Sequence, residues 1–171
     1  GLTLIGNESN GLLIVGGTEN TTIKNSYFQD LENGIYLYAS DSNTLSNITA
    51  YSNNYGIYLS YSNSNTLTSI TIYSNNLDGI RLEESNSNTL TSITSYSNDN
   101  GIRFFLSDSN IINNSKIYNN SNYGIYLSDA GKDGPNLIYN NFLNNTNNVG
   151  FGGTVYAKTW NTTKQPGENI A

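Results

Sequence analysis

Residues 55–76 read YGIYLSYSNSNTLTSITIYSNN, and nearly the same phrase occurs before and after them in the chain. A Gly followed by an apolar residue opens every copy. The glycines are 22 or 23 residues apart: Gly11, Gly34, Gly56, Gly79, Gly101 and Gly124. Self-similarity at a fixed period of this length is typical of solenoid proteins, in which each copy forms one unit of a stack.

Each period contains three segments in which apolar and polar residues alternate. Between residues 55 and 76, Ile and Leu residues fall on one side of the alternation, whereas Tyr and Thr residues fall mainly on the other. A period of two in segments rich in Ile, Thr and Tyr predicts strands and argues against helices. One copy cannot bury its apolar face alone, but stacked copies share a continuous core. We therefore predict an all-β parallel β-helix of about six coils of 22–23 residues, with three short strands per coil.

Asn recurs at two fixed places in the period. One column contains Asn43, Asn65, Asn88, Asn110 and Asn136, and the other contains Asn53, Asn75, Asn98 and Asn120. Asn also tolerates turn conformations, which is the simpler explanation of any single one. Because the same columns are filled repeatedly, we predict two ladders in which each amide bonds to its equivalent in the next coil.

The phrases GIYL, NTLT and YSNN resemble the repeats of NosD-like and surface-layer proteins of the right-handed parallel β-helix type. The tail from Trp160 to Gly167 resembles the segment that closes such helices. The resemblance covers nearly the whole chain and implies a right-handed solenoid. Its functional implications are diverse, since the family includes proteins linked to copper-enzyme maturation, surface layers and sugar processing.

The repeats predict two regions. Residues 1–148 are expected to form the coils, with an enlarged corner at 130–135, and residues 149–171 an irregular C-terminal cap. The stretch Leu2–Ile5 already has the pattern of a strand, and no capping segment precedes it. We expect this open end to be covered by another molecule, which predicts end-to-end self-association, or to have been cut from a longer chain.

Composition excludes several classes of function. The net charge is −6, and the Lys and Arg residues are scattered, so no basic patch for nucleic acid is expected. The chain has no His, Cys or Met, which are the ligands that copper prefers, and its acidic residues are mostly isolated. We predict no metal site and no cofactor. No apolar run is long enough to span a membrane.

The Gly-containing strands predict a row of outward side chains. Its candidate members for carbohydrate binding are Tyr36, Tyr58, Arg81, Arg103 and Tyr126, with Phe105 in the neighbouring row. Tyr and Arg stacked at strand spacing provide apolar surfaces and hydrogen-bond donors that suit sugar rings. The simpler interpretation is that they are same-face neighbours that stabilise the sheet. Asp78, Glu83 and Arg103 are expected to lie close together, but catalysis is not expected, because only Glu83 faces squarely outward.

Acceptor sequences for N-glycosylation occur about as often as chance predicts in a chain so rich in Asn, Ser and Thr. They are at Asn7, Asn20, Asn47, Asn113, Asn119, Asn144 and Asn161. None of the Asn residues of the two ladders is an acceptor, which is compatible with glycans on the outside.

From these observations, we predict a non-enzymatic, extracellular structural module, either part of a cell-surface layer or a subunit of a filament or sheet. The alternative is a carbohydrate-binding module that uses the outward Tyr and Arg residues. Binding of glycans by that row would distinguish the carbohydrate-binding module from the structural module.

Overall fold

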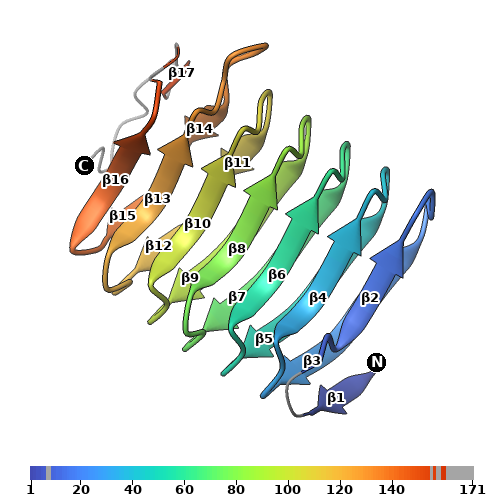
Figure 1. Cartoon of the computed structure of the whole chain (residues 1–171). Coiled ribbons are helices and arrows are strands. Elements are labelled where there is room, and N and C mark those ends of the chain that lie inside the picture. Colours follow the sequence, from blue (N-terminus) through green and yellow to red (C-terminus); the bar gives the residue numbers. More distant parts are fainter. Residues whose placement is uncertain (7–8, 155, 157–158, 161–171) are drawn as a thin grey trace.

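The computed structural model describes residues 1–6, 9–154, 156 and 159–160, and in them the chain is an all-β solenoid of parallel strands. Figure 1 shows the coils stacked from the N-terminus toward β17, with two sheets running along the stack. Every pairing joins strands of successive coils in parallel, offset by one period, as between Ile57 in β6 and Ile80 in β8. The predicted parallel β-helix is confirmed.

The seven-stranded sheet contains the strands that begin near the repeated Gly. They are β2 (Leu12–Val15), β4 (Asn33–Tyr38), β6 (Tyr55–Ser60), β8 (Asp78–Glu83), β10 (Asn100–Phe105), β13 (Tyr123–Ser128) and β16 (Asn147–Gly152). From β4 to β13, the inward Ile, Leu and Phe side chains are buried, as at Ile35, Leu82 and Phe104. This sheet presents its other face to solvent, which is where the candidate site lies.

The ten-stranded sheet contains the remaining strands. They are β1 (Thr3–Ile5), β3 (Thr22–Gln29), β5 (Thr44–Tyr51), β7 (Thr66–Tyr73), β9 (Thr89–Tyr96), β11 (Ile111–Asn113), β12 (Lys116–Tyr118), β14 (Leu137–Tyr139), β15 (Phe142–Asn144) and β17 (Thr159–Trp160). Each eight-residue strand has one residue with positive φ in its interior, such as Ser69 (φ 55°) in β7. That residue turns the strand, so one long strand supplies two of the three straight segments predicted per coil.

The inward Ile and Leu side chains of successive coils form one continuous core. In β6 and β7, Ile57, Leu59, Leu67 and Ile72 are completely inaccessible to solvent. The repeated Gly belongs to this packing rather than to a turn. A Cβ at Gly56 would lie 2.6 Å from the carbonyl oxygen of Gly79 and 2.6 Å from Ile72, so only Gly fits there.

Both predicted Asn ladders are present, and their main bond differs from the one expected. The backbone N–H of each Asn donates to Oδ1 of the Asn in the next coil, at 2.8 Å from Asn65 to Asn88 and 3.0 Å from Asn75 to Asn98. In the second ladder, the side-chain Nδ2 donates to the same oxygen as well, at 2.9 Å from Asn75 to Asn98. The ladders therefore satisfy corner backbone groups that would otherwise be buried without partners.

A third ladder of Ser residues was not predicted. The backbone N–H of Ser62 donates to Oγ of Ser85, at 3.0 Å, and Ser85 donates in the same way to Ser107, at 3.0 Å. Each hydroxyl in turn donates to the carbonyl two residues earlier, as Ser62 does to Ser60 at 2.9 Å. Ser is common throughout the chain, so this column does not stand out in the sequence.

The enlarged corner at 130–135 is held by one carboxylate. Asp108 accepts hydrogen bonds from the backbone N–H groups of Gly131, Lys132 (2.9 Å) and Asp133 (3.0 Å). The extra residues therefore leave the register of the adjoining strands intact, with Ile112 still opposite Ile138. The division into coils and cap at residue 148 stays a prediction, and residues 161–171 lie outside the described residues.

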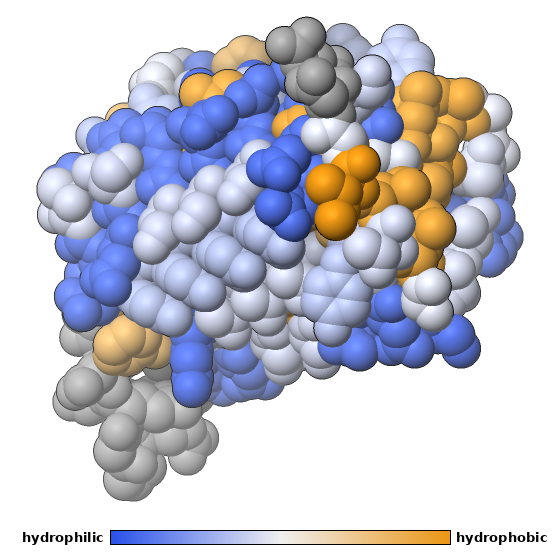
Figure 2. Space-filling model, turned by 90° about the horizontal axis from the view of Figure 1, so that it is seen from below, coloured by the Kyte–Doolittle hydropathy of each residue, from blue (hydrophilic) through white to orange (hydrophobic). Residues whose placement is uncertain are grey.

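The outer surface is mainly polar. Figure 2 shows blue and pale residues over most of the face seen from below, with hydrophobic residues gathered toward one end. Exposed large hydrophobic residues of the first coil are Leu2, Ile5, Leu13 and Val15. End-to-end association at this coil stays a prediction, since no partner chain is present.

Candidate functional site

The outward side chains of the seven-stranded sheet form one register-matched row, with one member per coil. The pairings run from Tyr36 to Tyr58, Arg81, Arg103 and Tyr126 in successive strands β4, β6, β8, β10 and β13. We call these five residues the Tyr/Arg row. All are half-buried, so each contacts its neighbours and remains accessible. Phe105 lies in the next row, opposite Glu83.

Aromatic rings flank the two guanidinium groups of this row. The rings of Tyr36 and Tyr58 are stacked, with centroids 4.9 Å apart. Arg81 lies over Tyr58, with its Cζ 5.5 Å from the ring centroid, and Arg103 lies over Tyr126 at 5.3 Å. Both distances are within the range of cation–π contacts, which stabilise the two guanidinium groups beside the rings.

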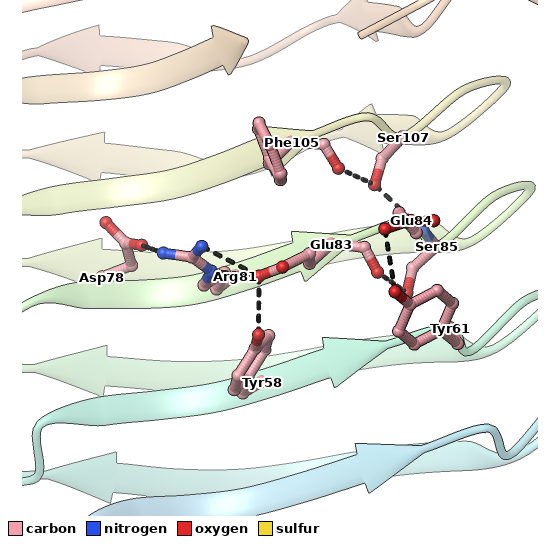
Figure 3. A network of polar contacts seen from close by, with 9 residues as sticks. All are labelled: Tyr58, Tyr61, Asp78, Arg81, Glu83, Glu84, Ser85, Phe105 and Ser107. Atoms are coloured by element: carbon pink, nitrogen blue, oxygen red, sulfur yellow. Dashed lines mark hydrogen bonds and ion pairs between the residues drawn. The ribbon is translucent and has the colours of Figure 1, made fainter. Parts of the chain in front are cut away.

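Arg81 is held by two carboxylates of its own strand (Figure 3). Its Nε and NH2 donate to Oε2 of Glu83, at 3.1 and 2.8 Å, and NH1 lies 3.7 Å from Oδ2 of Asp78. The hydroxyl of Tyr58 donates to the same Oε2 of Glu83, at 2.6 Å, from the adjacent strand. Glu83 therefore receives three hydrogen bonds from two neighbours.

These contacts shift the pKa values of both partners. Burial raises the pKa of Glu83, but the hydrogen bonds from Tyr58 and Arg81 and the charge of Arg81 outweigh burial and lower it. Burial, the bond to Glu83 and the Glu83 charge all raise the pKa of Tyr58. Near neutral pH, this places a carboxylate and a protonated phenol in direct contact, with the proton on Tyr58.

Asp78 lies beside Arg81 at the start of β8 and is 2% exposed. Its Oδ1 accepts a hydrogen bond from Nδ2 of Asn100, at 2.8 Å, across β8 and β10. Burial raises the pKa of Asp78, while Asn100 and the charges of Arg103 and Arg81 offset part of that effect. Asp78, Arg81 and Glu83 thus form a compact cluster, as expected from the sequence for Asp78 and Glu83.

Arg103 differs from Arg81 because it makes no salt bridge with any residue that the structure describes. It is paired in register with Arg81, so two positive charges occupy neighbouring strands. Arg81 has carboxylate oxygens of Asp78 and Glu83 within 4 Å, whereas among the described residues Arg103 has none.

The structure brings together all the carbohydrate-binding candidates predicted from the sequence and adds residues that the prediction missed. Tyr55 lies under the guanidinium of Arg81, 5.7 Å from it, and Tyr123 stacks on Tyr126 at 4.9 Å. Both precede the repeated Gly, at the same position of the period. The recurrence of Tyr immediately before the repeated Gly was the signal in the sequence that could have identified them. The alternation of apolar and polar residues alone does not predict that these Tyr side chains lie beside the Tyr/Arg row. Whether the row binds carbohydrate stays a prediction.

The glycosylation candidates differ in accessibility. Asn20, Asn47, Asn119 and Asn144 are exposed. Asn113 is half-buried, and its Nδ2 donates to the hydroxyl of Tyr139 at 2.9 Å. Asn7 and Asn161 lie outside the described residues, so only the four exposed acceptors combine the sequence motif with open access.

The described residues contain neither a membrane-spanning helix nor a metal-binding cluster of acidic, His or Cys side chains. No helix there is long and apolar enough to cross a membrane. No group of three or more His, Cys, Asp or Glu residues there has an arrangement that could hold a metal ion.

The comparisons with known proteins give one family and several structural neighbours. The family model described as "Periplasmic copper-binding protein (NosD)" matches residues 3–171. A search among curated protein sequences found no significant match.

The structural neighbours include alginate epimerases. The periplasmic alginate epimerase AlgG, as a T265N T268M double mutant, is 20% identical with a TM-score of 0.76, and the match covers 82% of this chain and 35% of that one. The AlgG D317A mutant is 19% identical with a TM-score of 0.73 over 77% and 32%. The A-module of the mannuronan C-5 epimerase AlgE6 of Azotobacter vinelandii is 14% identical with a TM-score of 0.61 over 94% and 56%. This chain thus spans about a third of the AlgG chains, and at these identities the likeness shows the fold.

These findings correct the predicted function. A non-enzymatic structural module was expected, but the solved structures that the chain resembles are enzymes of polysaccharide chemistry, and the family is described by a periplasmic role. The prediction was wrong because it judged catalysis by the two-carboxylate arrangement of a glycosidase, for which only Glu83 faces squarely outward. Tyr, Asp and Glu can also serve as general acids and bases, so the lack of that arrangement does not exclude an enzyme.

The copper in the family description does not fit these residues. Copper sites use imidazole, thiolate or thioether ligands, and the chain has no His, Cys or Met. No step of a mechanism for this chain therefore passes through copper.

Proposed function

The chain belongs to the NosD family, and from that premise and the geometry of the Tyr/Arg row we propose that it binds an acidic polysaccharide and performs acid–base chemistry on it. The observation that carries the proposal is Arg103, a guanidinium without a carboxylate partner among the described residues, flanked by Arg81 and Tyr126. An anionic sugar polymer is the ligand that matches this combination of positive charge and aromatic surface.

The row suits a polymer better than a small molecule. Its members stand on five successive strands, at a spacing of about 4.8 Å per coil, so the surface is long and narrow. Arg103 would bind a carboxylate of the sugar, and the Tyr residues would contact the apolar faces and hydroxyls of neighbouring units. The periplasmic descriptions of the family and of AlgG support an exported protein of the cell envelope. An extracellular position remains part of this proposal.

The reaction class that fits the cluster is proton transfer at the sugar carbon that bears the carboxylate. A guanidinium bound to that carboxylate makes the adjacent C–H more acidic, because it stabilises the negative charge that develops when the proton leaves. Tyr58 and Glu83 are in contact and differ in protonation, so together they have a proton to donate and a site to accept one. The printed activity of the neighbours, epimerisation of alginate, belongs to this class.

The test combines binding with turnover. We expect polymannuronate, but not a neutral glucan, to bind the wild-type protein in calorimetry. Replacing Arg103 with Ala removes a charge-assisted hydrogen bond of about 1.5–3 kcal/mol, which corresponds to roughly 10- to 150-fold weaker binding. The matched control is Lys116→Ala, which removes the same charge from an exposed position on the ten-stranded sheet and leaves binding unchanged.

Turnover is measured by incubating the polymer with the protein in heavy water. Deuterium at the carbon next to the carboxylate, detected by NMR, is expected with the wild-type protein and not with Tyr58→Phe. Binding without exchange would contradict the catalytic part of the proposal and leave the binding part standing. No binding of the anionic polymer, or equal loss in both Ala variants, would contradict the whole.

A further inference from the structure

Buried polar atoms without partners are concentrated beside the arginines. Five buried side-chain atoms of the described residues lack a hydrogen bond, and three of them are Oδ2 of Asp78, Oδ1 of Asn100 and Nε of Arg103. Asp78 and Asn100 are opposite each other on β8 and β10, and they are 2% and 4% exposed. Each unsatisfied buried group costs about 1–3 kcal/mol, so this clustering requires a physical explanation.

The protonation of Asp78 removes two of these unsatisfied atoms at once. The Nδ2 of Asn100 already donates to Oδ1 of Asp78, at 2.8 Å. A carboxylic acid and a primary amide can bond in a ring of two hydrogen bonds, since each has one donor beside one acceptor. If Oδ2 of Asp78 has a proton, it becomes the donor that Oδ1 of Asn100 lacks. When Asp78 is a carboxylate, its Oδ2 and the Oδ1 of Asn100 both lack a donor, because Arg81 NH1 is 3.7 Å from Oδ2, beyond hydrogen-bond reach.

The charged groups around Asp78 determine how its protonation changes the charge of the site. On its own strand, the facing groups are Arg81 and Glu83, and from the side of β10 they are Arg103 and Asp99. On β6, Tyr55 lies beside Arg81. With Asp78 ionised, the two arginines face three carboxylates, Asp78, Glu83 and Asp99, and one net negative charge repels an anion. With Asp78 neutral, the charges of the cluster cancel, and this repulsion is removed.

We propose that Asp78 is a proton-binding positioning residue of this site, so that the anionic polysaccharide and a proton bind together. The inference rests on the proposed function and adds to it a thermodynamic coupling between proton binding and polysaccharide binding. The neutral acid pairs with Asn100 and leaves Arg103 free for the sugar carboxylate, whereas the ionised form competes with that carboxylate for both arginines. Burial of Asp78, which raises its pKa, supports the same assignment.

The linkage has a definite sign. Binding of an anion next to Asp78 favours its neutral form, so a proton is taken up wherever free Asp78 is ionised. The affinity for polymannuronate therefore falls as pH rises through the titration of Asp78, with a limit of about tenfold per pH unit for one proton. Below that range the affinity is constant.

The experiment is calorimetry with polymannuronate at several pH values between about 5 and 8, above the titration of ordinary carboxylates. Two buffers of different ionisation enthalpy are used at each pH, which reports protons taken up on binding. We expect proton uptake by the wild-type protein and none by Asp78→Asn, whose affinity should be high and independent of pH. Asp133→Asn is the control, because Asp133 is an exposed aspartate of the enlarged corner and lies outside this cluster, so the variant retains the proton uptake and the pH dependence.

A second measurement does not depend on variants. The 13Cγ signal of Asp78 in the wild-type protein should titrate above those of the exposed aspartates. Titration of Asp78 in the ordinary range, or the same proton uptake by Asp78→Asn, would overturn the inference. Absence of polymer binding at every pH would instead overturn the proposed function, so the two failures are distinguishable.

Discussion

Asn75 allows the contribution of the ladders to stability to be worked out bond by bond. Its Oδ1 accepts from N and Nδ2 of Asn53, at 3.0 and 3.1 Å, and its Nδ2 donates to Oδ1 of Asn98 at 2.9 Å and to the carbonyl of Ala50 at 3.5 Å. Asn75→Ala removes all of these and leaves the buried N–H of Asn53 unsatisfied. At about 1 kcal/mol per bond, and more for the unsatisfied donor, we expect a loss of roughly 4 kcal/mol.

The adjacent residue provides the control. Asn76 is exposed, and its Nδ2 makes one hydrogen bond, to Oδ1 of Asn54 at 2.9 Å. Asn76→Ala should therefore cost less than about 0.5 kcal/mol. The measurement is equilibrium unfolding in urea followed by circular dichroism, with the midpoints compared at unchanged slope. Equal, small losses in the two variants would mean that the ladder contributes little, and the reasoning about buried corner groups would be refuted.

Three further predictions test other features. Gly79→Ala should destabilise the protein, because a Cβ would lie 2.6 Å from the carbonyl oxygen of Gly101; an unchanged melting temperature would contradict the packing argument. Glu83→Gln should lower the melting temperature at neutral pH, and the difference should shrink below about pH 4, because a carboxyl with a lowered pKa stabilises the fold only while ionised; a difference independent of pH would count against the network. If the protein is glycosylated in its native source, peptide mass spectrometry should find glycan on Asn47 but not on half-buried Asn113, and the reverse result would refute the accessibility argument.

The coil architecture was predictable because it depends on periodicity. Recurrence of Gly, Ile and Asn at one spacing gives the stacking, the inward face and both ladders. The partner atoms were not predictable, since whether Asn65 bonds through its backbone or its side chain depends on how the corner turns. The bend inside each eight-residue strand was also hidden, because Ser69 at the bend looks like any other Ser of the pattern.

The candidate site was predictable as a row but not as a network. Alternation places Tyr58, Arg81 and Arg103 on one face, and the register confirms it. Alternation does not reveal that Asp78, at the start of its strand, is buried beside Arg81, nor that Arg81 is held by Glu83 while Arg103 is not. Those differences come from side-chain lengths and cross-strand contacts, and they decide which charge a ligand can use.

The constant register between coils allows a protein of this kind to lengthen by duplication of a coil. Each coil between residues 34 and 120 adds one residue to the Tyr/Arg row and its own Asn to each ladder, so a duplicate of residues 55–76 inserted after Asn76 brings its own internal bonds. The duplication would extend the Tyr/Arg row by one Tyr and about 4.8 Å without altering any existing contact except at the junction. Surface length and stability would grow in the same step, so a lineage could match a longer ligand by changing the number of coils.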